Sequence, residues 1–505
     1  MNANERYRRP FGELLCSRVA RKATWWGTMF ATLVICAATT ITLHAQGLFT
    51  VHNFDGTDGS EPAQGLVQGA DGNLYGATQY GGANNYGTVF KITHAGVVTT
   101  LHTFDSTDGY FPWPLVQGAD GNFYGTTYSG GGSTSCPYGG CGTVFKITPS
   151  GALTTLHIFC AEAGCSDGSG PYLGLILGND GNFYGTTTLG GASGEGTVFR
   201  ITPGGTLTTL YSFCSRSGCS DGFLPSAALV LGADGNFYGT TSYSGTGSPY
   251  PGTVFKITPK GFLTTLYTFC SQPNCTDGTQ PISLVQGVDG NFYGATQYGG
   301  VYPPSCPVPY GCGTVFKLTP SGKSTTLYSF CSQSGCADGI DPYGLTQGTD
   351  GNFYGTTSTG GSGSGTVFSI TPSGKLTTLV NFDGTNGADP YLGGLVQDTN
   401  GRFYGTTLQG GASGYGTVFG FAVAGLGPFV ETRPASGKVG TTVRILGTNL
   451  SGATGVTFNG TAATFKVDSG SLISTTVPVG ATAGAVQVTT PQGTLSSNVV
   501  FRVGH

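Results

Sequence analysis

The chain has 505 residues, of which 90 are glycine, 12% are aromatic and only 9% are charged. So long a chain rarely shares one hydrophobic core, so at least two domains are expected. The shortage of Glu and Lys argues against a helical protein, and the many aromatic residues exclude a disordered one. A net charge of −4 without a basic stripe argues against nucleic-acid binding.

Residues 1–45 have the pattern of an export signal. A basic leader precedes an apolar run over residues 25–43, and Ala45-Gln46 offers a small-residue cleavage point. The apolar run is almost long enough to span a bilayer. We predict a signal peptide, and the alternative is an uncleaved N-terminal anchor. A membrane contact is expected only if the leader stays uncleaved.

Two phrases recur seven times, in step, along most of the chain. The first, Asp-Gly-Asn-Phe-Tyr-Gly-Thr-Thr with small variations, begins at residues 71, 120, 180, 234, 289, 350 and 400. The second, Gly-Thr-Val-Phe-Lys-Ile-Thr, begins at residues 87, 142, 196, 252, 313, 365 and 416. A repeat of about 50 to 60 residues indicates an array of similar structural units.

Within one period the sequence predicts four short strands. In the second copy they cover residues 115–118, 122–127, 143–148 and 153–159. The Asp-Gly step between the first two strands is typical of a tight turn, so we interpret Asp71 and its equivalents as turn residues rather than calcium ligands. Four-stranded units of this period match the blades of a β-propeller.

The two ends of the array complete one another. Residues 49–54 resemble a fourth strand with no blade before it, and the seventh copy has no fourth strand after residues 417–422. Pairing these segments closes a ring and removes its exposed edges. The expected fold is all-β, with a seven-bladed β-propeller over residues 46–425.

The quoted phrases resemble the Gloeo/Verruco (GloVer) tandem repeat, in proteins of the choice-of-anchor type. The resemblance covers about residues 48–424. It implies an exported bacterial protein and carries no established activity.

A second module is expected over residues 426–505. Short alternating apolar segments separated by turns, such as Val456-Thr457-Phe458 and Val486-Gln487-Val488, are typical of a small β-sandwich. The segment is similar to the IPT/TIG domain, which implies an immunoglobulin-like fold and a role as a spacer or adhesion module.

Twelve cysteines fall into six local pairs with four or five intervening residues. This spacing lets each loop fold back to disulfide distance, whereas zinc ligand pairs usually sit closer together and need further partners. Disulfides are typical of proteins outside the cytoplasm, which agrees with the leader. We predict the disulfide pairs Cys136/Cys141, Cys160/Cys165, Cys214/Cys219, Cys270/Cys275, Cys306/Cys312 and Cys331/Cys336.

No arrangement of nucleophile and base stands out in the sequence. His52, His102 and His157 occupy a position that other copies fill with tyrosine, which favours packing. Glu61, Glu162 and Glu195 are scattered single residues. We therefore predict a protein that is not an enzyme and has no cofactor or metal.

The most variable loops are those between strands two and three and those between blades. Both open on one face of a propeller, and variable loops on a rigid scaffold often bind ligands. Aromatic side chains there are candidates for stacking on sugar rings, namely Tyr80, Tyr128, Tyr243, Tyr298 and Tyr302.

The sequence therefore predicts a monomeric, non-enzymatic binding or structural protein of the cell surface or extracellular space. Its expected partner is a glycan or another surface protein. One alternative is a carbohydrate-binding propeller resembling lectins, and a second is a polysaccharide-active enzyme.

Overall fold

The computed structural model describes residues 46–62, 65–132, 136, 140–245, 251–301, 306, 311–391 and 394–504. The predicted signal peptide and Tyr302 lie outside these residues. Within the described ranges, no helix is long and apolar enough to cross a membrane. The secondary structure there is almost entirely β-strand, with a few short 3₁₀ turns.

Each sequence repeat forms one antiparallel sheet. The sheets are formed by β2 (Val67–Gln68), β3 (Leu74–Thr78), β4 (Thr88–Ile92) and β5 (Val98–Thr103); by β6 (Tyr110–Pro112), β7 (Val116–Gln117), β8 (Phe123–Ser129), β9 (Thr143–Ile147) and β10 (Leu153–Ile158); by β11 (Ser169–Leu177), β12 (Phe183–Leu189), β13 (Thr197–Ile201) and β14 (Leu207–Ser212); and by β15 (Phe223–Pro225), β16 (Val230–Leu231), β17 (Phe237–Tyr243), β18 (Thr253–Ile257) and β19 (Leu263–Thr268).

The later repeats follow the same plan. Their sheets are formed by β20 (Thr279–Gln286), β21 (Phe292–Tyr298), β22 (Thr314–Leu318) and β23 (Ser324–Ser329); by β24 (Ile340–Gln347), β25 (Phe353–Thr359), β26 (Thr366–Ile370) and β27 (Leu376–Asn381); and by β28 (Val396–Gln397), β29 (Phe403–Thr407), β30 (Thr417–Ala422) and β1 (Gln46–Asn53).

The predicted strands are present, with one difference at the first strand. In three repeats the first strand begins directly after the loop between repeats, as β11, β20 and β24 do, and in two others a short extra strand, β6 or β15, stands there. The sequence hid this extension because it contains an X-Pro step, which argues against a strand. The proline is tolerated because it lies on an edge strand of its sheet.

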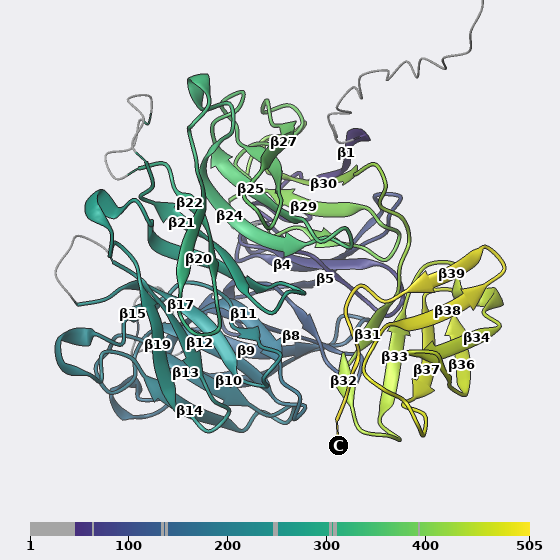
Figure 1. Ribbon diagram of the computed structural model, residues 1–505. Coiled ribbons are helices and arrows are strands. Elements are labelled where there is room, and N and C mark those ends of the chain that lie inside the picture. Colours follow the sequence, from purple (N-terminus) through teal and green to yellow (C-terminus); the bar gives the residue numbers. More distant parts are fainter. Residues whose placement is uncertain are drawn as a thin grey trace, which may run out of the picture. The chain divides into compact units, whose positions relative to one another are not determined.

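The expected pairing of the two array ends is confirmed. β1 lies antiparallel beside β30, with Phe49 opposite Gly420 and Thr50 opposite Phe419, and the two strands are adjacent in Figure 1. The sheet of the last repeat therefore takes its outer strand from the start of the described chain.

Glycine within the second strand allows close packing inside each sheet. A Cβ atom on Gly125 would lie 2.6 Å from Cζ of Phe145 on the neighbouring strand. Tyr124, next to it, stacks on Phe183 of the following sheet with ring centroids 4.0 Å apart. The repeated Phe-Tyr-Gly phrase therefore supplies contacts both within a sheet and between sheets.

Successive sheets bury one apolar cluster between each pair. One such cluster joins Tyr75 of the first repeat to Phe123 of the second, and another joins Tyr354 of the sixth to Phe403 of the seventh. A further cluster joins Tyr404 of the last repeat to Leu74 of the first. The last sheet thus packs on the first.

The C-terminal residues form separate sheets. One contains β31 (Glu431–Arg433), β33 (Thr442–Leu446), β37 (Leu472–Thr476) and β36 (Phe465–Ser469); another contains β35 (Thr461–Ala462), β34 (Gly455–Phe458), β38 (Val486–Thr490) and β39 (Gly493–Ser496); a third pairs β32 (Ser436–Gly437) with β40 (Arg502–Val503). The two four-stranded sheets share one apolar core that includes Ile445, Ile473 and Val488.

Candidate functional site

The six predicted disulfides are all present, with Cα–Cα distances between 4.0 and 6.0 Å. Two of them close a loop between the second and third strands, namely Cys136–Cys141 and Cys306–Cys312. The other four close a loop between successive repeats, namely Cys160–Cys165, Cys214–Cys219, Cys270–Cys275 and Cys331–Cys336.

The loops between repeats are more regular than the sequence suggested. Cys219 and Cys275 lie in the predicted loops, where they end the short 3₁₀ turns η3 (Ser217–Cys219) and η4 (Pro273–Cys275). The same turn recurs as η2 (Ala163–Cys165) and η5 (Ser334–Cys336). The sequence hid it because a serine- and glycine-rich segment between two cysteines carries no helical periodicity.

Backbone hydrogen bonds shape these turns. The N–H of Cys219 donates to the carbonyl of Arg216 at 2.9 Å, and that of Cys275 donates to the carbonyl of Gln272 at 3.0 Å. Both cysteines have a positive φ, of 48° and 51°, and both are half-buried. Neither belongs to a group of three or more possible metal ligands within the described ranges, so their part is to hold the loop.

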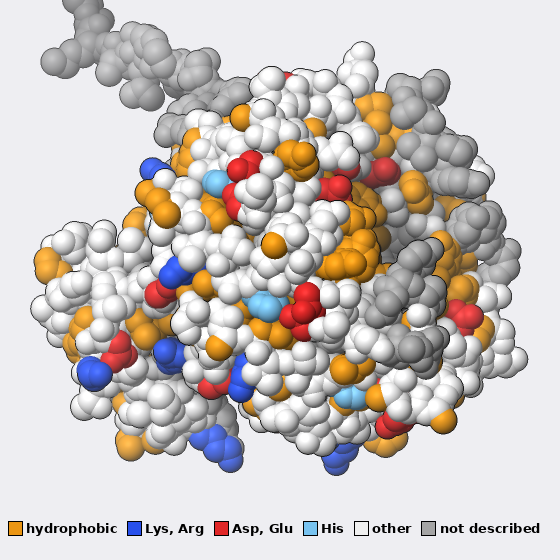
Figure 2. Space-filling view, turned by 180° about the vertical axis from the view of Figure 1, so that it is seen from behind, with side chains coloured by type: hydrophobic (Ala, Val, Ile, Leu, Met, Phe, Trp, Pro, Cys, Tyr) orange, Lys and Arg blue, Asp and Glu red, His pale blue; other side chains and the backbone are white. Residues whose placement is uncertain are grey.

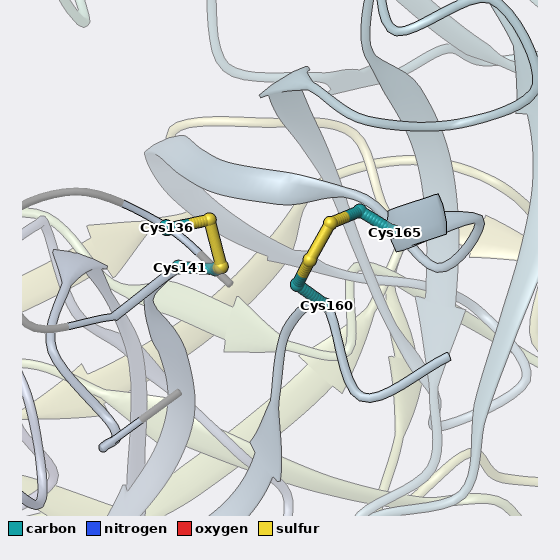
Figure 3. Close-up of side chains that lie close together, drawn as sticks. All are labelled: Cys136, Cys141, Cys160 and Cys165. Atoms are coloured by element: carbon teal, nitrogen blue, oxygen red, sulfur yellow. A yellow bond between two sulfur atoms is a disulfide. The ribbon is translucent and has the colours of Figure 1, made fainter. Parts of the chain in front are cut away.

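One disulfide between the second and third strands lies beside one disulfide between successive repeats. The sulfur atoms of Cys136, Cys141, Cys160 and Cys165 all lie within 4.8 Å of one another (Figure 3). A strand-two-to-three loop is therefore held against the following loop between repeats.

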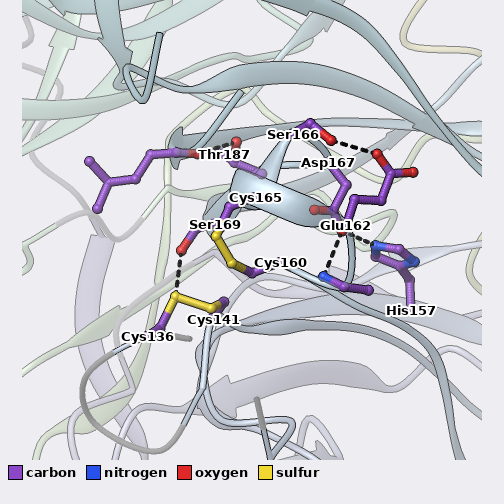
Figure 4. Close-up of a disulfide and its surroundings, with 12 residues drawn as sticks. Cys136, Cys141, His157, Cys160, Glu162, Cys165, Ser166, Asp167, Ser169 and Thr187 are labelled. Atoms are coloured by element: carbon purple, nitrogen blue, oxygen red, sulfur yellow. Dashed lines mark hydrogen bonds and ion pairs between the residues drawn. A yellow bond between two sulfur atoms is a disulfide. The ribbon is translucent and has the colours of Figure 1, made fainter. Parts of the chain in front are cut away.

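The aspartate of each loop between repeats is held by the preceding outer strand. His157 Nε2 lies 3.0 Å from Asp167 Oδ2 (Figure 4), and the Tyr211 hydroxyl donates to Asp221 at 2.7 Å. Where the outer strand carries Val380 instead, the loop carries Asn386. Each histidine or tyrosine therefore acts with its aspartate as a pair that fixes the loop.

The aspartates of the Asp-Gly turns are also occupied by structural contacts. Asp120 accepts hydrogen bonds from the backbone N–H of Asn122, from its side-chain amide at 2.7 Å and from the Tyr124 hydroxyl at 2.8 Å. The same three contacts recur at Asp71 and at Asp180. This supports the interpretation of these residues as turn formers.

The most unusual backbone geometry lies at the start of the first strands. Each repeat has an X-Pro step there, and the residue before the proline has a positive φ between 52° and 61° in all seven copies. This conformation costs a residue other than glycine about 1–2 kcal/mol. We call these residues the inner rim: Glu61, Phe111, Gly170, Leu224, Gln280, Asp341 and Asp389.

Contacts with the preceding repeat hold the inner rim in this conformation. The backbone N–H of Asp341 donates to the carbonyl of Cys312 at 3.1 Å, and that of Glu61 donates to the carbonyl of Tyr415 at 3.0 Å. The proline ring that follows fills the space above a glycine of the preceding repeat, where a Cβ on Gly416 would lie 2.7 Å from Pro62. The strain is therefore imposed by packing between sheets.

Three consecutive members of the inner rim are acidic. Burial, and then the neighbouring Asp389 carboxylate, raise the pKa of Asp341 to about 7. Burial, and then the Glu61 carboxylate, raise the pKa of Asp389 to about 6, and burial also raises the pKa of Glu61. We call these three residues the acidic arc. The prediction that Glu61 is a scattered single residue is therefore wrong, because Asp389 and Glu61 become neighbours only where the last sheet meets the first.

The four described candidate tyrosines are all half-buried and lie beside inner-rim residues or beside one another. The Tyr80 ring centroid lies 4.6 Å from that of Phe111, and the nearby Glu61 carboxylate contributes to raising the pKa of Tyr80 after burial. Tyr298 lies close to Asp341 and to Tyr243.

Residues that follow the X-Pro prolines form an aromatic layer next to the inner rim. Tyr128 lies 6.1 Å from Tyr172 of this layer, measured between ring centroids. Trp113 packs against Tyr172 at 4.4 Å, and Tyr343 packs against Tyr391 at 4.5 Å. Burial, and then Tyr391 of the seventh repeat, raise the pKa of Tyr172 of the third repeat, so the layer spans distant repeats.

A cavity of about 350 Å³ lies beyond the aromatic layer. Its lining comes from the first-strand region of every repeat and includes Leu66, Leu115, Leu175, Leu284 and Leu345. Figure 2 shows one face of the molecule, on which hydrophobic side chains gather around a hollow with acidic side chains close by. The first strands are thus the innermost strands, and the inner rim stands at one end of the space that they enclose.

A family model decides the classification of the chain. The Gloeobacter/Verrucomicrobia repeat matches residues 26–249 and 225–464. The chain belongs to this repeat family. No curated protein matches this Gloeobacter/Verrucomicrobia repeat chain.

Solved structures resemble this repeat protein in fold. A fungal alcohol oxidase of the AA5 family, in complex with copper, is 12% identical with a TM-score of 0.50, covering 92% of this chain and 100% of that one. PorZ, a bacterial surface component of the type-IX secretion system of Porphyromonas gingivalis, is 15% identical with a TM-score of 0.43, covering 86% of this chain and 58% of that one. A PQQ-bound aldose sugar dehydrogenase from Streptomyces coelicolor is 14% identical with a TM-score of 0.38, covering 62% of this chain and 94% of that one. The alcohol oxidase, at a TM-score of 0.50, shows a likeness of fold alone.

Sequence reasoning missed Asp341 and Asp389 although a signal was present. When the repeats are aligned on their prolines, the preceding position holds Phe, Gly, Leu or Gln in four copies and an acid in three. This position varies in chemistry beside a proline that is present in all seven copies, which is typical of a variable position on a fixed scaffold.

Proposed function

We propose that this protein is an exported, non-enzymatic carbohydrate-binding protein of the cell surface or extracellular space. Its repeats form a closed seven-bladed propeller, followed by an immunoglobulin-like sandwich of the IPT/TIG kind. The closed propeller is supported by the packing of the last sheet on the first and by the shared strand β1. The disulfides favour a location outside the cytoplasm.

One observation carries the ligand class. Half-buried tyrosines and the three carboxylates of the acidic arc gather around the inner rim, next to the loops that the disulfides hold. Sugars are recognised by aromatic faces that cover the ring and by carboxylates that accept bonds from hydroxyl groups. A rigid site with both kinds of group fits a carbohydrate better than it fits a flat protein surface.

A glycan array tests the proposal with three variants. Tyr80→Ala and Tyr298→Ala should each lower binding by at least tenfold, because each removes a ring face beside the acidic arc. Phe262→Ala is the matched control, since this side chain is 72% exposed and follows a turn between strands three and four. Absence of any glycan signal for the wild-type protein would remove the carbohydrate proposal.

A polysaccharide-active enzyme remains the second candidate, and one specific observation favours it. The neighbouring carboxyls of Asp341 and Asp389 have pKa values of about 7 and about 6. Asp341, with the higher value, is suited to donate a proton near neutral pH. Release of new reducing ends from a bound polysaccharide, lost in Asp341→Asn, would replace the binding proposal with this one.

A further inference from the structure

In the part of the chain that the structure describes, the acidic arc has no cationic partner within ion-pair distance. The Oδ1 atoms of Asp341 and Asp389 are buried and have no hydrogen-bond partner among the described residues. Buried polar atoms are nearly always partnered in folded proteins, so these two oxygens are suited to a group that arrives from outside.

The aromatic layer provides a second and independent sign of a ligand. Tyr343 is only 1% exposed, and its hydroxyl has no hydrogen-bond partner in the described part of the chain. Burial, and then Tyr391, Asp341 and Tyr298, raise the pKa of this hydroxyl well above its usual value. The indole Nε1 of Trp113, a side chain that is 4% exposed, is likewise buried without a partner. Unused polar groups therefore lie both in the acidic arc and in the layer beside it.

The spacing of the acids selects the kind of cation. Within the described ranges, the groups whose ligand atoms approach within 4.8 Å of one another in threes consist of cysteines alone. The three carboxylates are thus too far apart to coordinate one small divalent ion together. An ammonium group needs direct contact with only one or two of the carboxylates, because the others attract its charge through space in a poorly solvated site.

The neighbouring aromatic side chains favour the same cation. The Asp341 carboxylate contributes, after burial, to raising the pKa of both Tyr298 and Tyr343, and Tyr391 packs on Tyr343. An ammonium group is attracted to the face of an aromatic ring in a desolvated site. The next inner-rim residue after the three acids is Phe111 of the second repeat, and its ring contacts that of Tyr80. One side of the site therefore suits a positive charge, and the adjoining side suits the apolar face of a sugar ring.

We propose that the inner rim binds an amino sugar through its protonated primary amine, with Asp341, Asp389 and Glu61 as the negative partners. The proposal rests on the carbohydrate-binding function proposed above and names its ligand class. Oligosaccharides of glucosamine are the simplest ligands that carry both a protonated amine and a sugar face. N-acetylation removes the charge and keeps the ring, so the acetylated oligomer is the matched comparison.

The pH dependence follows from the groups that face the site. The tyrosines Tyr80, Tyr110, Tyr298 and Tyr343 have pKa values raised above the usual value, so they stay protonated below pH 9. The groups of the site that change charge between pH 5 and 8 are the carboxyls of Asp341 and Asp389, whose pKa values are about 7 and about 6. Because an ammonium ligand favours their ionised forms, binding at pH 5 should release protons and should tighten as the pH rises from 5 to 6.5. Binding should weaken again towards pH 7.5, because the amine of a glucosamine residue loses its own proton around neutral pH.

Isothermal titration calorimetry on the purified protein tests this proposal. Glucosamine oligomers and N-acetylglucosamine oligomers of equal length are titrated at pH 5, 6.5 and 7.5, in buffers of different ionisation enthalpy that report proton release. We expect at least tenfold tighter binding of the glucosamine oligomer at pH 6.5. Asp341→Asn and Asp389→Asn should each lower the ratio of the two affinities at least tenfold. Each variant should also release fewer protons on binding. Asp468→Asn, in the C-terminal sheets, makes the same charge change and should leave both unchanged.

The other outcomes separate the two proposals. Equal binding of both oligomers would overturn the amine proposal and leave carbohydrate binding in place. No binding of either oligomer, together with an empty glycan array, would overturn both. If an oligomer of lysine bound as tightly as the glucosamine oligomer, recognition of a sugar would be overturned. Thermal unfolding of each variant confirms that a loss of binding does not come from misfolding.

Discussion

At the scale of single residues, the inner rim combines two costs that a purely structural position would avoid. Asp341 has a positive φ of 54°, and its carboxyl is buried with an unpartnered oxygen. Glycine occupies the equivalent position in the third repeat, as Gly170, without either cost. Residues that lower stability and are nevertheless retained are often found at functional sites.

This trade-off predicts how stability changes with pH. The pKa of Asp341 is about 7 in the folded protein and about 3.9 in an unfolded chain. Between these values the folded state holds a proton that the unfolded state has lost, so the free energy of unfolding falls as the pH rises from 4 to 7. Asp341→Asn removes this slope and should raise stability at pH 8 by on the order of 3 kcal/mol. Urea denaturation at pH 5 and pH 8 measures the difference.

Asp55→Asn is the control for this measurement. A hydrogen bond from the Thr57 side chain, with further backbone hydrogen bonds, lowers the pKa of Asp55 to about 2. Its carboxyl is therefore ionised in both states above pH 5 and contributes no slope between pH 5 and 8. An identical pH dependence in wild type and Asp341→Asn would contradict the buried, raised-pKa carboxyl.

At the scale of single elements, β1 is the strand on which the closure of the array depends. It covers the edge of β30, and Phe49 packs against the apolar cluster that joins the last repeat to the first. An unpaired edge strand is a ready site for aggregation. No contact from within its own repeat can replace β1, because the seventh copy contributes three strands of its own.

Deletion of residues 46–53 should therefore lower the free energy of unfolding by roughly 3 kcal/mol or more and promote aggregation. Thermal unfolding followed by circular dichroism, with light scattering, measures both effects. Thr50→Ala is the control, since the Thr50 side chain is exposed. A peptide of residues 46–54 added in excess should restore part of the lost stability. An unchanged melting temperature of the deletion variant would show that closure does not depend on β1.

At the scale of the whole molecule, the apolar clusters between sheets carry the stability and the disulfides add to it locally. Each disulfide closes a short loop, with a sequence separation of five or six residues. The first two repeats form the equivalent loop without cysteines, where Asp55 or Asp105 accepts hydrogen bonds from a threonine two residues later. The loop conformation is therefore available without the covalent bond.

We expect the double variant Cys160→Ser/Cys165→Ser to lose roughly 2 kcal/mol of stability and to keep its fold. Reduction of all six disulfides should lower the midpoint of thermal unfolding in the same way, leaving the far-ultraviolet circular dichroism of the native protein unchanged at 25 °C. Complete unfolding on reduction would mean that the disulfides organise the fold.

The repeat by itself determined the four main strands of each unit, the pairing of the array ends and the disulfide partners, but not the extension of the first strand. These features depend on contacts within one unit, or on a phrase repeated in every unit, so each copy of the sequence carries the same information. The outer-strand His or Tyr and the loop aspartate belong to this class, and the joint change to Val380 and Asn386 is visible in the sequence.

The acidic arc was decided only by the tertiary structure. Glu61 and Asp389 belong to opposite ends of the array and meet because the last sheet packs on the first. The X-Pro step also hides the inner strand that carries them, since its positive φ is imposed by the preceding repeat rather than by local preference. The sequence shows acids before the proline in three copies, but it does not show that they meet, because their conformation comes from a neighbouring unit and their charge matters beside a distant one.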